Sequence, residues 1–374
     1  MKITREIKYV CGLFLATRIA LTIIGVVSRL LLKPFLIEDY MWTYSKHLWL
    51  GIWGVWDSGS YLGIAANWYP KDPHVLLGAS VYAFFPLYPL LMRIFGVVVR
   101  SNFLAGIIVS NSALIFACLY LYKLVRMDSD EETALRAIKY LFLFPTAFIL
   151  SGVFAEALFL ALALACFYYA RNNKWFLAGL CGFFLSLTRA PGLLIMVPLL
   201  YEYLKGIQFK ISRMRIDILF LLLIPLGLFL VCAHHYYLTG DWLAYIHTLQ
   251  KGWETGFNNP FYSFYQALFL HKHITIAFPA YCSLAAALLL MIFYKSIGFS
   301  YWLFGVSMLL LPVAISSLYI FNSMLRYLLP IFPLYIILAK MSRGSRADQL
   351  IAMFLALLQG FLMVFWSNGL NIVV

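Results

Sequence analysis

Residues 56–93 carry the side chains of this chain that are best suited to chemistry. The stretch begins with WDSGSYLGIA at positions 56–65 and ends with FFPLYPLLMR at positions 84–93. Asp57 is its acid, and a well-placed carboxylate can exchange protons with a reacting group. Helical spacing places Asp57, Tyr61 and Trp68 on one face. Asp57 also has a structural interpretation, because an acid at the start of a helix often caps it or interacts with its dipole.

Three further charged residues are candidates, although they lie far from Asp57 in the sequence. Glu156 is expected at the outer end of an apolar helix, where an unpaired acid is costly. We interpret it either as a site residue or as the structural partner of a nearby arginine. Arg189 and Arg326 suit a lipid-linked phosphate, because the guanidinium is a planar fork of donors. Their alternative role is to snorkel toward lipid headgroups.

His234 and His235 are adjacent at the end of another apolar segment. Adjacent residues point to different helix faces and lack the i, i+4 spacing of a zinc pair, so we interpret them as polar lining of a site. The sequence contains no glycine-rich phosphate loop, serine nucleophile elbow, HExxH or paired-aspartate metal motif. We therefore predict no metal and no cofactor, and any chemistry is expected at the outer membrane face.

The composition indicates an all-α polytopic membrane protein. The chain has 374 residues, of which 64% are hydrophobic and 11% are charged, whereas soluble domains have about 25% charged residues. The formal net charge of +13 is spread over short loops between apolar runs. That distribution encodes membrane topology, so nucleic acid is not an expected partner. The six cysteines lie in apolar segments without a CxxC pair, which favours small core residues over disulfides or metal ligands.

We predict one membrane domain over 1–374 with about eleven transmembrane helices and a cytoplasmic N-terminus. Lys2, Arg5 and Lys8 precede the first span and place its start inside. The expected spans are 10–32, 103–125, 138–154, 157–170, two short or broken helices within 175–204, 216–238, 274–294, 300–320, 327–340 and 347–366. Residues 33–100 and 239–273 then form two large outer loops. Thr188–Gly192 is the expected break between the two short helices, because proline and glycine interrupt helices.

The segment 81–99 is long enough to cross a membrane, but we predict that it stays at the outer surface. Pro86 and Pro89 would break its first half, and Arg93 would lie at mid-bilayer. The following span, 103–125, ends in basic residues and must start outside, so 81–99 cannot have crossed. The tryptophans of residues 33–100 also favour amphipathic juxtamembrane helices, since indole rings settle at the membrane boundary.

Taken together, these motifs resemble the second GPI mannosyltransferase (PIG-V) family and its prokaryotic relatives. The resemblance covers most of residues 50–340, in order. It is carried by WDS and YLGIA at 56–65, FFPLYPLLMR at 84–93, FPTAF at 144–148 with Ser151 and Glu156, AGL at 178–180, LTRAPGL at 187–193, and Arg326-Tyr327. The chain departs from the family pattern at Trp68, which precedes Tyr69. It is also short for a eukaryotic enzyme, which favours a prokaryotic plasma-membrane protein.

The resemblance implies a GT-C glycosyltransferase, commonly a mannosyltransferase, that uses a polyprenyl- or dolichyl-phosphate sugar and inverts the anomeric centre without a metal. Asp57 would then be the general base, with Glu156 and Tyr61 orienting it or the acceptor. Arg326 and Arg189, with His234 and His235, would bind the donor phosphate. The expected partners are the lipid-linked donor, a glycan or glycolipid acceptor, and membrane lipids.

Two other classes remain open from the sequence. A transporter or flippase of a lipid-linked solute would explain the many spans and Arg18 within the first of them. It would, however, place ionisable residues at mid-bilayer in paired halves, whereas here they concentrate at the outer face. A scaffold subunit of a glycosyltransferase complex would keep the fold with a degraded site, and the presence of Asp57 argues against it.

Overall fold

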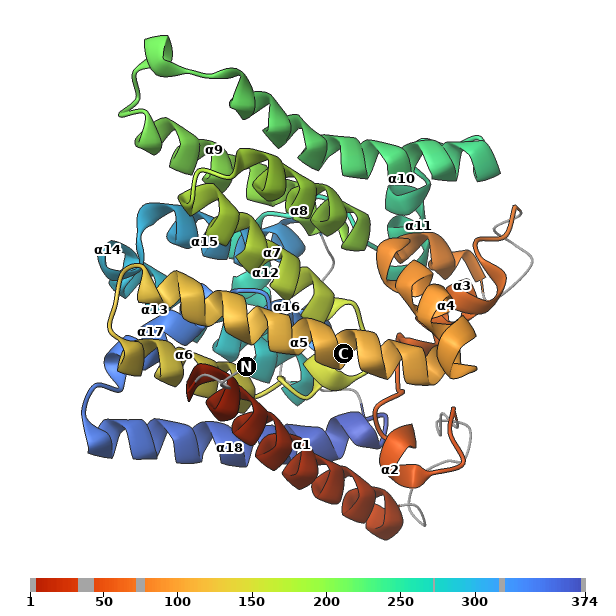
Figure 1. The fold of residues 1–374 in the computed structure, drawn as a ribbon. Helices are drawn as coiled ribbons and strands as arrows, with labels where there is room; N and C mark the ends of the chain where they lie inside the picture. The colour runs from red at the N-terminus through yellow and green to blue at the C-terminus, as the bar shows by residue number, and fades with distance from the viewer. Residues whose placement is uncertain (1–4, 33–43, 72–77, 272, 316–319, 371–374) are drawn as a thin grey trace.

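The computed structural model describes residues 5–32, 44–71, 78–271, 273–315 and 320–370 (Figure 1). Every regular element in these ranges is a helix, which confirms the all-α prediction. Parts of the first outer loop, at 33–43 and 72–77, lie outside the described residues.

The elements follow one another along the chain without a second unit. The first half comprises α1 (Arg5–Leu32), α2 (Leu48–Gly51), α3 (Ser58–Asn67), η3 (Gly78–Ala83), α4 (Leu87–Val99), α5 (Asn102–Arg126), α6 (Glu131–Leu143), η4 (Ile149–Ser151), α7 (Glu156–Arg171), α8 (Trp175–Thr188), η5 (Ala190–Ile195) and α9 (Met196–Gly206). The second half comprises η6 (Ile211–Arg213), η7 (Ile216–Leu222), α10 (Leu223–Thr239), α11 (Ala244–Trp253), α12 (Pro260–Tyr265), η8 (Gln266–Leu270), α13 (Ile274–Ile292), α14 (Tyr294–Ile297), α15 (Phe299–Ala314), α16 (Ile320–Tyr327), α17 (Pro333–Met341) and α18 (Ser345–Ser367).

Five helical segments of the described chain are long and apolar enough to cross a membrane. They are α1, α5 with the turn after it, η7 with α10, α13 and α18. This confirms a polytopic membrane protein. Helices α7 and α15 have 16 residues each, or roughly 24 Å at 1.5 Å per residue, against about 30 Å for a bilayer core. The count of eleven spans therefore stays a prediction.

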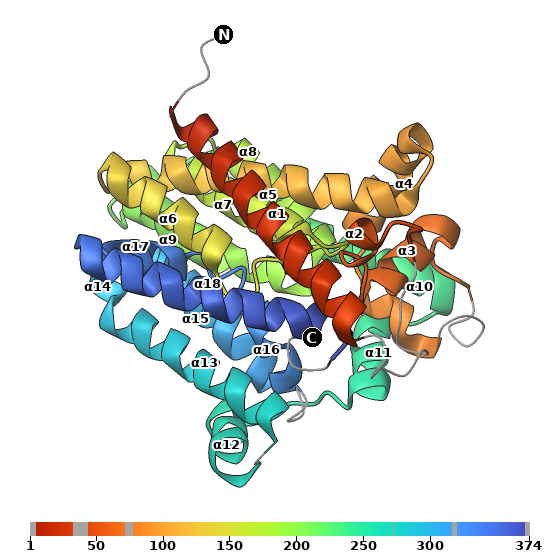
Figure 2. The same cartoon turned by 90° about the horizontal axis from the view of Figure 1, so that it is seen from below.

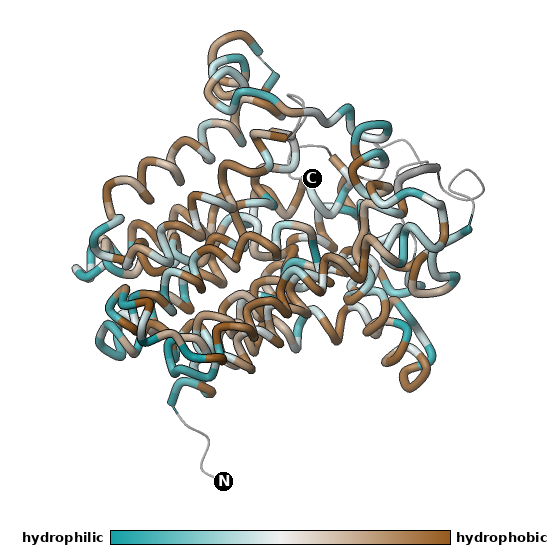
Figure 3. Tube along the Cα trace, turned by 90° about the horizontal axis from the view of Figure 1, so that it is seen from above, coloured by the Kyte–Doolittle hydropathy of each residue, from teal (hydrophilic) through white to brown (hydrophobic). Residues whose placement is uncertain are grey.

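The long helices run side by side between two ends of the molecule (Figures 1 and 2). Helices α3, α4 and α11 lie at one end, on the right of Figure 1, and α14 lies at the other. Hydrophilic residues gather toward these ends while the middles of the helices are hydrophobic (Figure 3). This distribution suits a bundle whose middle faces hydrocarbon and whose ends face water.

Helix α7 is the central helix and places a charged residue at each end. It packs against α5 and α8, and its alanines at 157, 161, 163 and 165 are buried. Small residues of this kind let neighbouring helix backbones approach closely. Glu156 is its first residue and Arg171 its last. The helix therefore joins the two ends of the molecule through a tightly packed core.

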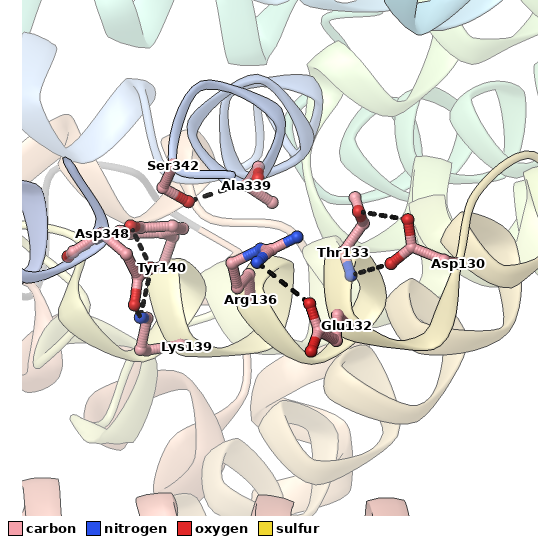
Figure 4. Close-up of polar contacts among 9 residues, drawn as sticks. All are labelled: Asp130, Glu132, Thr133, Arg136, Lys139, Tyr140, Ala339, Ser342 and Asp348. Atoms are coloured by element: carbon pink, nitrogen blue, oxygen red, sulfur yellow. Dashed lines mark hydrogen bonds and ion pairs between the residues drawn. The ribbon is translucent and has the colours of Figure 1, made fainter. Parts of the chain in front are cut away.

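The start of α6 and its contact with α18 are set by polar side chains (Figure 4). Asp130 is the N-cap, and its Oδ1 accepts a hydrogen bond from the backbone N–H of Thr133 at 2.7 Å. Farther along α6, Lys139 and Tyr140 both bind the carboxylate of Asp348 in the first turn of α18. These contacts join α6 and α18 at the end of the molecule opposite α3.

Two expected spans are wrong in their boundaries. The span predicted at 138–154 is interrupted, because α6 ends at Leu143 and Phe144 is extended with ψ 138°. Pro145 explains this, since the residue before a proline avoids the helical region and proline itself has no N–H to donate. Likewise, no span begins at Arg326. That residue lies in the last turn of α16, and Pro330 and Pro333 separate it from α17.

Two other local predictions hold. The chain breaks between α8 and α9, where Arg189 is extended and Ala190–Ile195 form a short 3₁₀ helix. Helix α4 has 13 residues, or roughly 20 Å, which is too short to cross a bilayer core. This length agrees with the surface position predicted for 81–99.

Candidate functional site

Four charged side chains from distant parts of the chain meet beside α3. Arg326 donates from Nη1 to Oδ2 of Asp57, and Arg189 donates from Nη1 to Oε1 of Glu156. The Nε atom of Arg326 lies 3.4 Å from the same Glu156 oxygen. Two acids and two arginines thus form one continuous network. The structure brings together the four charged candidates that the sequence singled out.

Asp57 occupies the N-cap position of α3 but does not cap it. Its side chain accepts no hydrogen bond from the helix N–H groups, and its backbone has φ −60° and ψ −11° instead of an extended N-cap conformation. The carboxylate binds Arg326 instead. The capping interpretation of Asp57 is therefore wrong for this geometry, because its oxygen is directed at a guanidinium contributed by α16.

The residue before Asp57 holds an unusual backbone conformation. Trp56 has φ +54°, in the left-handed region that a bulky residue seldom enters. Such strain persists only where the surrounding structure enforces it, and it concentrates at functional sites. Behind it, Ser58 is fully buried and donates to the carbonyl of Val153 at 3.2 Å. The turn that presents Asp57 is therefore attached to the segment just before Glu156.

Glu156 is the buried centre of the network. Its side chain is 1% exposed, whereas that of Asp57 is 26% exposed. Its Oε1 serves both arginines, and its Oε2 has no hydrogen-bond partner among the described residues. The alternative in which Glu156 is an arginine partner thus describes its contacts. An acid at this depth needs such partners, because an unpaired buried charge is strongly destabilising.

Arg326 is held from two sides. Asp57 and Glu156 are its carboxylate partners, and its guanidinium lies over the rings of Phe154 and Tyr327 at 5.8 and 5.5 Å. Burial lowers the pKa of Arg326, but the attraction of Asp57 and Glu156 outweighs that effect and holds the pKa well above its ordinary value. Arg326 therefore remains a permanent positive charge in the site.

The loop between α6 and α7 supports this arrangement from below. The hydroxyl of Thr146 donates to the carbonyl of Leu325 at 3.0 Å, and Arg18 donates from Nη2 to the carbonyl of Ala147 at 3.1 Å. Arg18 is 8% exposed, so it faces protein, as the sequence predicted for a charge inside the first span. The FPTAF motif at 144–148 thus contacts the residue next to Arg326.

Tyr61 lies close to the network but in apolar surroundings. It is 5% exposed, and its ring packs edge-on against Phe84 and Tyr88 with centroids 5.0 Å away in each case. Within the described chain its hydroxyl makes no hydrogen bond to Asp57 or Glu156. The structure therefore places Tyr61 as packing beneath α3, and its orienting role stays a prediction.

His234 and His235 pack against aromatic side chains. Nε2 of His234 accepts a hydrogen bond from the Trp68 indole at 3.1 Å, and His235 lies against the rings of Tyr69 and Tyr82. Neither histidine contacts the four charged residues in the described ranges. Trp68, which departs from the family pattern, is therefore a contact between α3 and the end of α10.

The network is electrically balanced and partly open. Two carboxylates face two guanidinium groups, and the most exposed of the four side chains is that of Asp57. Its Oδ1 makes no hydrogen bond to any residue the structure describes. A hydroxyl group could therefore reach this oxygen, while the arginines behind it could attract an anion. No cluster of three metal-ligating side chains occurs among the described residues.

Sequence reasoning missed two aromatic residues of the site. Tyr327 lies against both arginines, with Arg189 5.3 Å from its ring centroid, and Phe154 lies under Arg326. The position of Tyr327 directly after Arg326 was the available signal for the first. Phe154 gave none, because it is one of 32 phenylalanines in an apolar chain.

Comparisons with known proteins return structures but no sequence family. No protein-family model and no curated protein sequence matches the chain. Similar solved structures include the Archaeoglobus fulgidus oligosaccharyltransferase tethered with an acceptor peptide (TM-score 0.44, 13% identity) and the same protein in the apo form (TM-score 0.45, 12% identity). Each match covers 96% of this chain and 55% or 56% of the other. The chain thus spans about half the length of the structures it resembles.

Proposed function

We propose that this protein is a GT-C glycosyltransferase. It moves a sugar, most simply mannose, from a polyprenyl- or dolichyl-phosphate donor to a hydroxyl of a lipid- or glycan-linked acceptor. The observation that carries this proposal is the network of Asp57, Arg326, Glu156 and Arg189. Residues 269 positions apart are brought together there in a protein otherwise built of apolar helices.

Asp57 is the general base of the proposed reaction. Its carboxylate takes the proton of the acceptor hydroxyl while the hydroxyl oxygen bonds to the anomeric carbon. The bond from that carbon to the phosphate oxygen breaks, and the lipid phosphate leaves with the electron pair. Attack from the face opposite the leaving group inverts the anomeric centre. A positioned general base accelerates such a step by about 10²–10⁴-fold.

Arg326 binds the donor phosphate in this mechanism. Its guanidinium already lies beside Asp57, so a phosphate that it holds would place the anomeric carbon near the base. Binding would require Arg326 to exchange the Asp57 carboxylate for phosphate oxygens, while Glu156 keeps hold of Nε. That exchange would free Asp57 to accept a proton only when the donor is present. The unloaded site is thereby kept neutral by its own residues.

The remaining predicted residues support this core. Arg189 is the second cation for the leaving phosphate, and Glu156 is a positioning residue that holds both arginines in place. Two guanidinium groups stabilise the charge that develops on a leaving phosphate, so the proposed reaction is metal-independent and needs no cofactor. Tyr61, His234 and His235 are assigned to the surrounding wall, where the acceptor or the donor headgroup would lie.

The proposed location is the extracytoplasmic face of a prokaryotic plasma membrane. The basic loops around 126–139 and 205–215 lie at the end of the bundle opposite α3, and basic loops favour the cytoplasm. The site would then open where lipid-linked sugars are used as donors. The polyprenyl tail would remain in the bilayer against the exposed apolar helices, so the donor would need no soluble pocket.

The test is a transfer assay with purified protein in liposomes. Polyprenyl-phosphate mannose, the glucose analogue and GDP-mannose would be offered as donors, with a chelator present, to a glycolipid acceptor. We expect transfer from a lipid-phosphate sugar only, with an inverted anomeric configuration by NMR. Transbilayer movement of the labelled lipid without any glycosidic product would instead support the flippase alternative and refute the transferase.

A further inference from the structure

A second polar cavity lies at the end of the molecule opposite Asp57. It has a volume of about 220 Å³ and is lined by the last residue of α7, Arg171, together with residues of α9, α14, α15 and α17. Glu156 and Arg171 are the two ends of α7, so the cavity is roughly 22 Å from the charged network at 1.5 Å per residue. No motif of the proposed reaction uses it.

Five ionisable side chains line this cavity, and positive charge is in excess. They are Arg171, Lys205 and Lys340 against Asp128 and Glu202. Three cations and two anions leave a net charge of +1. A cavity with uncompensated positive charge between membrane helices attracts anionic groups.

The two acids are already engaged by neighbouring side chains. Asp128 accepts two hydrogen bonds from Arg171, one of them 2.7 Å long from Nη2 to Oδ1. Glu202 accepts one from the hydroxyl of Ser300. Arg171 also donates to the Tyr301 hydroxyl at 2.9 Å. These contacts build a rigid wall and leave the lysines as the available cations.

Lys205 and Lys340 form no ion pair within the described part of the chain. Lys205 is exposed at the cavity mouth, and Lys340 is half-buried and donates to the backbone carbonyl of Ser296. An ammonium group has three donors, so Lys340 keeps two after this contact. Two lysines therefore face the cavity with unused donors and unpaired charge.

The size and backbone of the cavity restrict what it can hold. Pockets for drug-sized ligands occupy about 300–1,000 Å³, so 220 Å³ suits a small group rather than a nucleotide. Gly298, which also lines the cavity, is the N-cap of α15 and has no side chain to occupy the first N–H groups of that helix. These donors add to the lysines, and both favour a compact anion.

We propose that this cavity binds a phosphate group, supplied either by the headgroup of an anionic lipid or by a free phosphate. Lys205 and Lys340 are its principal ligands, and Arg171 is held in the wall by Asp128. With the topology predicted above, the site faces the cytoplasm, opposite the catalytic face. It would fix the α7–α9–α15–α17 end of the bundle at the inner membrane surface.

The experiment uses the full chain in phosphatidylcholine nanodiscs. Calorimetric titration with inorganic phosphate tests the free ligand, and native mass spectrometry of nanodiscs that also contain phosphatidylglycerol tests the lipid. The Lys205→Gln/Lys340→Gln variant changes the net charge of the lining from +1 to −1. At about 1 kcal/mol per lysine near an anionic group, we expect binding to weaken roughly thirtyfold.

Lys210→Gln is the matched control, because Lys210 is exposed and lies outside the cavity lining. Lys205→Arg/Lys340→Arg should restore binding and thereby exclude a folding defect. Loss of phosphate binding in the glutamine variant supports a free ligand. Loss of retained phosphatidylglycerol alone supports a lipid headgroup. If both ligands bind equally to the wild type, the glutamine variant and the Lys210→Gln control, or bind to none of them, the proposal is wrong.

Discussion

The substitution Asp57→Asn separates the proposed chemistry from the stability of the site. Asparagine keeps the size of the side chain but removes its negative charge and its ability to take up a proton at neutral pH. Arg326 loses one of its two carboxylate partners and keeps the other, since Glu156 lies 3.4 Å from its Nε. The network should therefore remain assembled while the proposed base is lost.

The expected magnitudes differ for activity and folding. Turnover should fall by about 10²–10⁴-fold, the usual contribution of a general base. Stability should change less than the roughly 3–5 kcal/mol expected when a buried ion pair loses one partner, because the Asp57 side chain is 26% exposed and a second acid remains. A large loss of turnover with a small shift in the melting temperature is thus the predicted combination.

The assay measures transfer from a radiolabelled polyprenyl-phosphate sugar under single-turnover conditions, with thermal unfolding recorded on the same preparations. Asp241→Asn is the matched control, because Asp241 also pairs with a basic side chain, His247, at 2.6 Å but lies in another loop. The control should retain wild-type turnover. Undiminished transfer by Asp57→Asn would refute Asp57 as the base, even if its melting temperature changed.

Four further substitutions test the structure at other points. Glu156→Gln leaves Arg189 without its carboxylate partner and should lower the unfolding free energy by about 3–5 kcal/mol, measured by thermal unfolding in detergent. Arg326→Lys keeps the charge but removes the planar fork of donors, so the KM for the lipid-phosphate donor should rise at least tenfold while unfolding changes little; an unchanged KM and kcat would reject the phosphate role. Asp130→Ala removes the N-cap of α6 and should cost about 1 kcal/mol without affecting transfer. Gly179→Ala would bring a Cβ to 2.1 Å from a backbone oxygen of η7 and should destabilise the protein by about 1–3 kcal/mol. The same substitution at Gly206, which meets no atom within 4 Å, should be neutral.

Local features of the site were predictable because they depend on local chemistry. The apolar runs determine helices, and Pro191 with Gly192 predicts the break after α8 that the structure contains. Asp57 and Glu156 were identifiable because charged residues are rare in this chain and costly beside hydrocarbon. A rare, costly residue is informative without any knowledge of its partner.

Other features were wrong because a sequence pattern does not specify contacts between distant segments. Asp57 has the position of an N-cap, yet its carboxylate turns to Arg326, which is 269 residues away. The run 138–154 is apolar enough for a span, yet Pro145 ends α6 and leaves a loop that contacts Leu325. In both cases a contact with α16 decided the outcome.

The sequence by itself thus determined the membrane class, the all-helical fold and the four charged residues, since hydropathy and charge are properties of individual residues and their spacing. Only the tertiary structure decided that Asp57 pairs with Arg326, that Glu156 serves both arginines, and that Tyr61 packs in apolar surroundings. The physical reason is that a buried charge must find an opposite charge. Which one it finds depends on how α3, α7, α8 and α16 pack around the core.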